Sequence, residues 1–175
     1  MKNLLSLFRK QEEPLPATGP DGETLIYSPL GGRVVPVTTM KDQVFVQELL
    51  GKGVAVEPQV GRLTAPVGGT LSVLYPSGHA LCITTPDGLE LLLHIGEDTV
   101  QLGGKHFTTH ARQGDQVQAG QLLVEFDAQA IRQAGYTVTT PVLVLTPDRY
   151  ADIQLAPDAD ITPDQVLLRV YPRRA

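Results

Sequence analysis

Glycine and proline cut this chain into short segments, and their spacing constrains the fold more than any other feature. The 175 residues include 17 glycines and 14 prolines, a larger share than the roughly 12% that is usual for a globular chain. Such breaks exclude long helices, and the apolar and β-branched stretches between them are typical of strands. We expect strands at residues 24–27, 32–37, 53–58, 62–65, 69–75, 80–84, 89–95, 107–111, 121–126, 139–145 and 165–170.

An internal repeat indicates how these strands are organised. The sequence SPLGGRVVPV at residues 28–37 matches APVGGTLSVL at residues 65–74, which favours two similar hairpin units stacked on each other. The sequence therefore predicts an all-β sandwich or barrel built from two similar halves.

Helical segments are few and short. Residues 128–134 contain good helix formers, Asp127 can cap the first turn, and Gly135 can end the last turn in the left-handed conformation. A weaker helical turn is expected at residues 42–50. We expect one or two short helices beside the strands.

The length fits one domain at residues 23–172, preceded by a tail and linker at residues 1–22. Residues 11–22 contain three prolines and two glycines and cannot continue a helix. The first ten residues, MKNLLSLFRK, would be amphipathic as a helix. Two interpretations stay open for them, a frayed tail and a weak contact with anionic membrane.

Charge and cysteine content narrow the classes of partner and compartment. The formal net charge of −5 has the wrong sign for a chain that binds nucleic acid. The single cysteine, Cys82, excludes an internal disulfide and a four-cysteine zinc site, which suits a reducing compartment. No apolar run approaches the roughly 18 residues of a membrane span. We expect a cytoplasmic monomer, peripheral to the membrane at most.

Two of the four histidines are expected to meet across one hairpin. His79 and His94 lie on strands joined through Asp87-Gly88, a favoured two-residue turn. That turn would place Leu81 opposite His94, so that both histidines share one face as diagonal neighbours about 7–8 Å apart. Two imidazoles at one place could bind a metal, relay a proton or carry a phosphoryl group on nitrogen. Either histidine alone would be interpreted as an ordinary surface or half-buried strand residue, and for the pair both interpretations stay open.

A metal-dependent peptidase with a related two-halved β architecture is the alternative function. His94 and Asp98 have the His-x-x-x-Asp spacing of two zinc ligands in such enzymes. These enzymes also need a later His-x-His, which this sequence lacks. His106 and His110 lie in a segment that resembles a strand, where we expect solvated polar side chains.

One segment closely resembles a known phosphorylation-site signature. GLELLLHIGEDTV at residues 88–100 is similar to the signature of the glucose-type enzyme IIA (EIIA) domain of the bacterial sugar phosphotransferase system. Further landmarks occur in the family's order: APVGGT at 65–70, GHA at 78–80, GDQV at 114–117, VEFD at 124–127 and TPV at 140–142. The resemblance covers about residues 23–170 and implies an antiparallel β-sandwich of two similar halves.

The resemblance also implies specific roles and partners. His94 would take a phosphoryl group from the histidine phosphocarrier protein and pass it to a cysteine of a sugar-specific IIB domain. His79 would donate a hydrogen bond to that group, and Ser77 would orient His79. No cofactor or metal is implied, and some relatives also regulate other transporters or enzymes.

A docking surface around His94 is expected from the same resemblance. Glu97 stands where the family usually has an aliphatic residue, so a negative charge near His94 could retune partner choice or oppose phosphorylation. The residues expected at this surface are Val44, Phe45, Val46, Leu49, Leu50, Tyr75, Leu92, Glu97 and Asp98.

Overall fold

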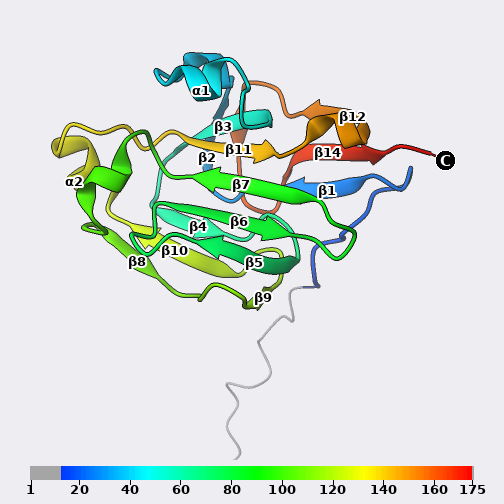
Figure 1. Ribbon diagram of the computed structural model, residues 1–175, viewed down its shortest axis with the longest axis horizontal. Coiled ribbons are helices and arrows are strands. Elements are labelled where there is room, and N and C mark those ends of the chain that lie inside the picture. The colour runs from blue at the N-terminus through cyan, green and yellow to red at the C-terminus, as the bar shows by residue number, and fades with distance from the viewer. Residues whose placement is uncertain (1–12, 175) are drawn as a thin grey trace, which may run out of the picture.

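Antiparallel β-sheets make up almost all of the regular structure. The structure is a computed structural model that describes residues 13–174. Its strands form one large sheet and two small ones, and the ladders between them run antiparallel (Figure 1). The predicted fold class, an antiparallel β-sandwich with few short helices, is confirmed. The expected segment at residues 1–10 lies outside the described residues.

The large sheet holds the centre of the molecule. Its eight strands in spatial order are β13 (Asp160–Ile161), β2 (Gly32–Val35), β3 (Lys52–Pro58), β11 (Thr140–Val144), β7 (Glu90–His94), β6 (Ala80–Thr84), β5 (Gly69–Leu74) and β9 (Gln116–Val117). One small sheet has the order β1 (Thr24–Tyr27), β14 (Val166–Pro172), β12 (Tyr150–Leu155). The other has the order β4 (Arg62–Thr64), β10 (Leu122–Phe126), β8 (Phe107–Thr109).

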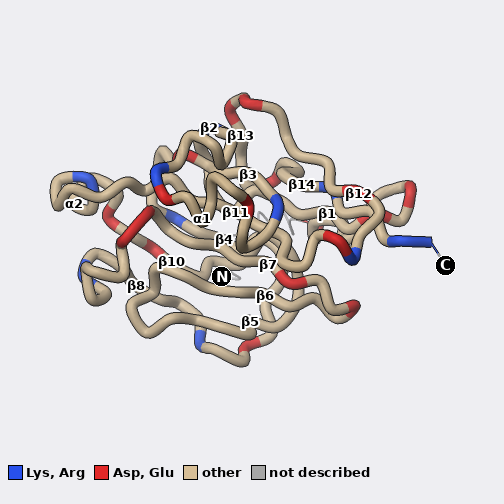
Figure 2. The backbone as a smooth tube through the Cα atoms, turned by 45° about the horizontal axis from the view of Figure 1, so that its top comes forward, with Lys and Arg blue, Asp and Glu red and all other residues tan. Residues whose placement is uncertain are grey.

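Alternating burial explains why β7 can carry both core and site residues. Leu91 and Leu93 are fully buried in the main core, whereas Leu92 and His94 face the other side of the sheet and are half-buried. This is the period of two that a strand imposes on its side chains. Charged residues lie mostly in the outer loops, and the central strands carry few of them (Figure 2).

The sequence repeat is a structural repeat. Gly32 of β2 lies opposite Ile161, and Gly69 of β5 lies opposite Val117. At both glycines a β-carbon would collide with a carbonyl oxygen of the neighbouring strand, so both halves need the same residue. The two halves join where β7 pairs with β11, which confirms the predicted pair of similar units.

Both predicted helices are present and are short. In α2 (Ala128–Gln133), Asp127 accepts a hydrogen bond from the backbone of Ala130 at 2.9 Å, and Gly135 follows with φ of 95°. The weaker turn becomes α1 (Gln43–Val46), with Asp42 as its cap. Three single 3-10 turns complete the helical elements of the described residues: η2 (Val37–Thr39), η3 (Thr99–Leu102) and η4 (Pro147–Arg149).

The hairpin between β6 and β7 differs from the prediction by one residue. Ala80, not Leu81, lies opposite His94. The loop contains Pro86 as well as the Asp-Gly pair, and it ends on Gly88 with φ of 86°. A three-residue loop of this kind, a turn followed by a left-handed glycine, is also common in hairpins. The predicted two-residue turn is therefore wrong.

The end of the expected linker packs against the first strand. The backbone N–H of Leu25 donates to Ala17 at 3.0 Å, and the Tyr27 hydroxyl donates to the carbonyl of Pro16 at 2.8 Å. A β-bridge joins Thr18 to Thr24. None of the helices within residues 13–174 is long and apolar enough to cross a membrane.

Candidate active site

The end of β7 holds His94 in one tautomer. Its ring nitrogen Nδ1 lies 2.6 Å from the carbonyl oxygen of Gly96. A carbonyl only accepts hydrogen bonds, so Nδ1 carries the proton and the lone pair remains on Nε2. Gly96 has φ of 73°, and a β-carbon there would collide with the carbonyl oxygen of Thr137. The glycine is thus required for the loop that orients His94.

His79 enters the site from the turn before β6. Gly78 precedes it with φ of 76°, and a β-carbon there would lie 3.0 Å from the side chain of Thr109. The hydroxyl of Ser77 lies 2.5 Å from Nδ1 of His79. The predicted contact between Ser77 and His79 is therefore present.

The two imidazoles meet, although the predicted register was wrong. Their ring centroids are 5.0 Å apart and the ring planes are inclined by 80°. Because His94 lies opposite Ala80, a regular pleat would place His79 on the other face of the sheet. His79 lies outside β6, where its carbonyl still accepts a 2.7 Å hydrogen bond from Ile95. The turn at Gly78 frees its ring to reach His94.

Burial keeps both histidines neutral at neutral pH. Burial lowers the pKa of His79 to about 4, and the neighbouring charge of a protonated His94 acts in the same direction. Burial also lowers the pKa of His94, partly opposed by its hydrogen bond to Gly96 and by the nearby carboxylates of Asp42 and Asp98. A neutral imidazole with a free Nε2 lone pair is a competent nucleophile.

Two aromatic rings border the histidine pair. The ring of Phe45 lies 5.5 Å from that of His94, and the ring of Tyr75 lies 5.3 Å from that of His79, between centroids. Tyr75 is 49% exposed, whereas Phe45 is 3% exposed. Phe45 packs in a small cluster with Val37, Met40, Ala55 and Leu143.

The expected docking residues divide by exposure. Phe45 and Glu97 are buried: Phe45 forms a wall of the site and Glu97 faces inward. Leu49, Leu50, Tyr75 and Asp98 are exposed, and Val44, Val46 and Leu92 are half-buried.

Glu97 accepts three hydrogen bonds from other parts of the chain. Its Oε1 accepts hydrogen bonds from the backbone N–H groups of Lys41 and Asp42, at 2.8 and 2.6 Å. Its Oε2 accepts from the hydroxyl of Thr137 at 3.3 Å. Asp98, the next residue, is exposed and has φ of 58°.

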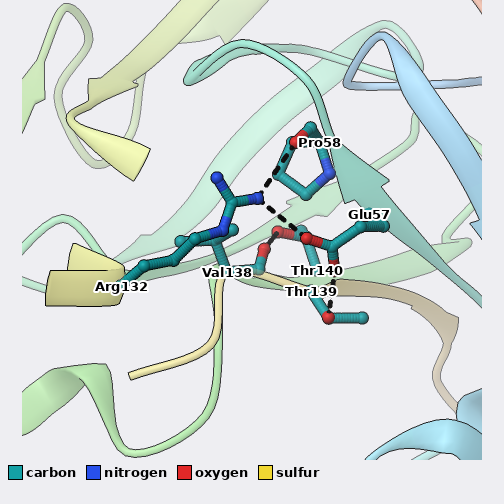
Figure 3. Close-up of polar contacts among 6 residues, drawn as sticks. All are labelled: Glu57, Pro58, Arg132, Val138, Thr139 and Thr140. Atoms are coloured by element: carbon teal, nitrogen blue, oxygen red, sulfur yellow. Dashed lines mark hydrogen bonds and ion pairs between the residues drawn. The ribbon is translucent and has the colours of Figure 1, made fainter. Parts of the chain in front are cut away.

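A polar network behind the site was missed by the sequence analysis. Arg132 of α2 donates to Oε1 of Glu57 at 2.8 Å and to the carbonyl of Pro58 at 3.3 Å, and the hydroxyl of Thr139 donates to the other oxygen of Glu57 (Figure 3). The carbonyl of Thr139 accepts a 3.1 Å hydrogen bond from the N–H of Gly96. The network thus supports the loop that orients His94. Glu57 lies more than seventy positions from both Arg132 and Thr139, and no sequence spacing signals their contact.

A metal site has little support in the described residues. Among residues 13–174, no group of three or more His, Cys, Asp or Glu side chains could hold an ion. Nε2 of His110 lies 3.6 Å from a carboxylate oxygen of Glu125, and His106 is half-buried with φ of 76°. Neither His106 nor His110 therefore forms a metal-binding group with His94 and Asp98.

Comparison with known proteins decides the family. Residues 24–150 match the model of a family described as phosphoenolpyruvate-dependent sugar phosphotransferase system, EIIA 1. The chain belongs to this family. As an EIIA domain it is a phosphoryl carrier and a phosphotransferase subunit.

Relatives of this EIIA domain occur alone and within longer proteins. It is 39% identical over 150 residues to the PTS system glucose-specific EIIA component of Halalkalibacterium halodurans, which covers 86% of this chain and 85% of that protein. It is 46% identical over 154 residues to the PTS system beta-glucoside-specific EIIBCA component of the same organism, which covers 88% of this chain. The match spans only 24% of that longer protein.

A solved structure has the same fold. The glucose permease IIA from Mycoplasma capricolum superposes with a TM-score of 0.78 at 28% sequence identity, covering 84% of this EIIA domain and 95% of that chain. The match supports the β-sandwich that carries the paired histidines.

Proposed function

We propose that Nε2 of His94 is the phosphoryl acceptor and that the donor is the histidine phosphocarrier protein. The observation that carries the proposal is the hydrogen bond from Nδ1 of His94 to Gly96, because it leaves the lone pair on Nε2. That lone pair attacks phosphorus, the bond between phosphorus and the donor's histidine nitrogen breaks, and the donor nitrogen keeps the electron pair.

His79 would stabilise the phosphoryl group in transit. If the Ser77 hydroxyl donates to Nδ1 of His79, the ring carries its own proton on Nε2, beside His94. An N–H donor at this place stabilises charge on the phosphoryl oxygens. His79 remains neutral at neutral pH. It therefore donates this hydrogen bond without adding a positive charge to the site.

The second step returns His94 to its starting state. A cysteine thiolate of a IIB domain attacks phosphorus, and the bond to Nε2 of His94 breaks with its electron pair remaining on nitrogen. Relatives named EIIBCA and EIICBA components support a IIB domain as the acceptor. The exposed side chains of Tyr75 and Leu49 would meet either partner. Both histidines come from one hairpin, so a monomer suffices, and we expect it to act in the cytoplasm.

Phosphoryl transfer from phosphoenolpyruvate tests the proposal. The protein is incubated with the phosphocarrier protein and its upstream kinase, and mass spectrometry then locates the acid-labile phosphate. His94→Ala should abolish incorporation, whereas His79→Gln should accept phosphate but transfer it poorly to a IIB domain. Phosphate retained in His94→Ala, or lost only in His79→Gln, would overturn the assignment.

A further inference from the structure

The buried carboxylate of Glu97 joins three separate parts of the chain. Glu97 is 9% exposed, and it bonds the backbone of Lys41 and Asp42 through one oxygen and the hydroxyl of Thr137 through the other. These partners lie in the turn before α1 and in the segment before β11. Hydrogen bonds to a charged acceptor are stronger than neutral ones, so the carboxylate ties the three segments together.

Each segment that Glu97 joins contacts the ring of His94 or the loop that holds this ring. The loop after β7 supplies the Gly96 carbonyl that holds Nδ1. The turn before α1 leads into the helix that carries Phe45, whose ring lies 5.5 Å from that of His94. The carbonyl of Thr137 sits so close to Gly96 that only glycine fits there. A shift of any of the three would move a wall or a support of His94.

We propose that Glu97 is a positioning residue for phosphoryl transfer, in which its ionised carboxylate fastens the turn before α1 to the loop after β7 and so holds Phe45 and the Gly96 carbonyl against His94. It acts through these neighbours and does not touch the transferred group. The inference rests on the proposed function insofar as His94 is the acceptor.

An aliphatic side chain could not perform this role. The N–H groups of Lys41 and Asp42 would lose the charged acceptor at 2.8 and 2.6 Å, and the loss of two hydrogen bonds to a charged group destabilises the turn that carries them. The turn would then reorganise to find another acceptor, and α1 would move with it. In-line transfer is sensitive to such displacement, because about 1 Å of misplacement can cost on the order of a hundredfold in rate.

The charge of Glu97 has a second effect that can be measured separately. It raises the pKa of His94, as do the carboxylates of Asp42 and Asp98, against the larger effect of burial. His79 faces the same ring, and its pKa of about 4 keeps it uncharged at neutral pH. Removal of the Glu97 charge should therefore lower the pKa of His94 further and extend phosphoryl acceptance to lower pH.

Two substitutions separate position from charge. Glu97→Gln removes the charge but retains an oxygen that can accept from both N–H groups, whereas Glu97→Leu removes both. Both variants should shift the acid limb of the pH profile to lower pH. Only Glu97→Leu should lower kcat for acceptance from the phosphocarrier, by on the order of tenfold to a hundredfold, with Glu97→Gln within about threefold of wild type.

A signal from the unphosphorylated protein provides an independent measurement. The Nδ1 proton of His94 should give a slowly exchanging resonance in a nitrogen-proton correlation spectrum of the wild type and of Glu97→Gln. In Glu97→Leu it should broaden or shift. This measurement needs no phosphoryl transfer, so it remains valid if His94 proves not to be the acceptor, which His94→Ala reports separately.

Glu23→Gln is the matched control. Glu23 is also a buried carboxylate, 1% exposed, that accepts a backbone hydrogen bond from Asp21 and pairs with Arg169, outside the site. Its replacement should leave kcat, the pH profile and the His94 resonance unchanged, even if the melting temperature falls. If Glu97→Leu lowers only the melting temperature, with wild-type kcat and an unchanged His94 resonance, the positioning role is refuted.

Discussion

Acid should destabilise this domain through His79, and the effect can be calculated from the structure. The pKa of His79 is about 4 in the folded domain, whereas a histidine in an unfolded chain titrates near 6.5. Each unit of difference corresponds to about 1.4 kcal/mol, so full titration of His79 should lower the free energy of unfolding by about 3 kcal/mol.

The direction follows from which state binds the proton first. As the pH falls below about 6.5, the unfolded chain is protonated at residue 79 while the folded domain stays neutral, so unfolding becomes more favourable. The stability that the neutral His79 contributes is fully present above the pKa of the unfolded chain, and it is lost as the pH falls to about 4. Below that value both states bind the proton and the loss levels off.

Urea denaturation at a series of pH values measures this contribution. The chain has no tryptophan and 5 tyrosines, so circular dichroism is the appropriate signal. His79→Gln should lose less stability than wild type between pH 7 and pH 4, by about 3 kcal/mol. His110→Gln, at an exposed histidine outside the site, should retain the wild-type loss. Equal losses in wild type and His79→Gln would refute the reasoning.

Three further predictions concern residues that support the pair. Phe45→Ala should lower the free energy of unfolding by about 3 kcal/mol, because Phe45 is buried in a small cluster; calorimetry measures this, and a loss below about 1 kcal/mol would place Phe45 at the surface. Gly96→Ala should displace the loop at Thr137 and abolish phosphoryl acceptance, so wild-type acceptance would contradict the geometry. Ser77→Ala should slow transfer by about tenfold, since nothing then holds the tautomer of His79; an unchanged rate would exclude this role.

Local sequence chemistry predicted most of the fold. The strand at residues 80–84 matches β6 at both ends, because Gly78 and Pro86 flank an apolar run. The cap at Asp127 and the glycine after the last turn located α2. These elements depend on interactions between residues close in sequence, which a pattern can show.

The missed strands lack such a pattern. In β12 only Ile153 is buried, and its other side chains are half-buried or exposed, so no alternation appears. Strands β9 and β13 have two residues each and exist only because a neighbouring strand pairs with them.

The details of the site depend on contacts that sequence spacing does not show. An apolar residue in a four-residue helix can face the core or a partner, and Phe45 faces the core. The charge of Glu97 near His94 was apparent, but its partners at Lys41 and Asp42 lie more than fifty positions away. The histidines were expected to meet through strand register, whereas a turn at Gly78 brings them together.

The duplicated architecture gives His94 a counterpart in the other half. Within the large sheet His94 lies opposite Ala80, and at the equivalent place Leu143 lies opposite Gly53. Leu143 is buried against Phe45, and Phe45 in turn contacts the ring of His94. One half of the sheet therefore carries the proposed phosphoryl acceptor, while the equivalent residue of the other half packs beneath the ring that borders it. Exchange of the two side chains would remove both the proposed acceptor and this packing.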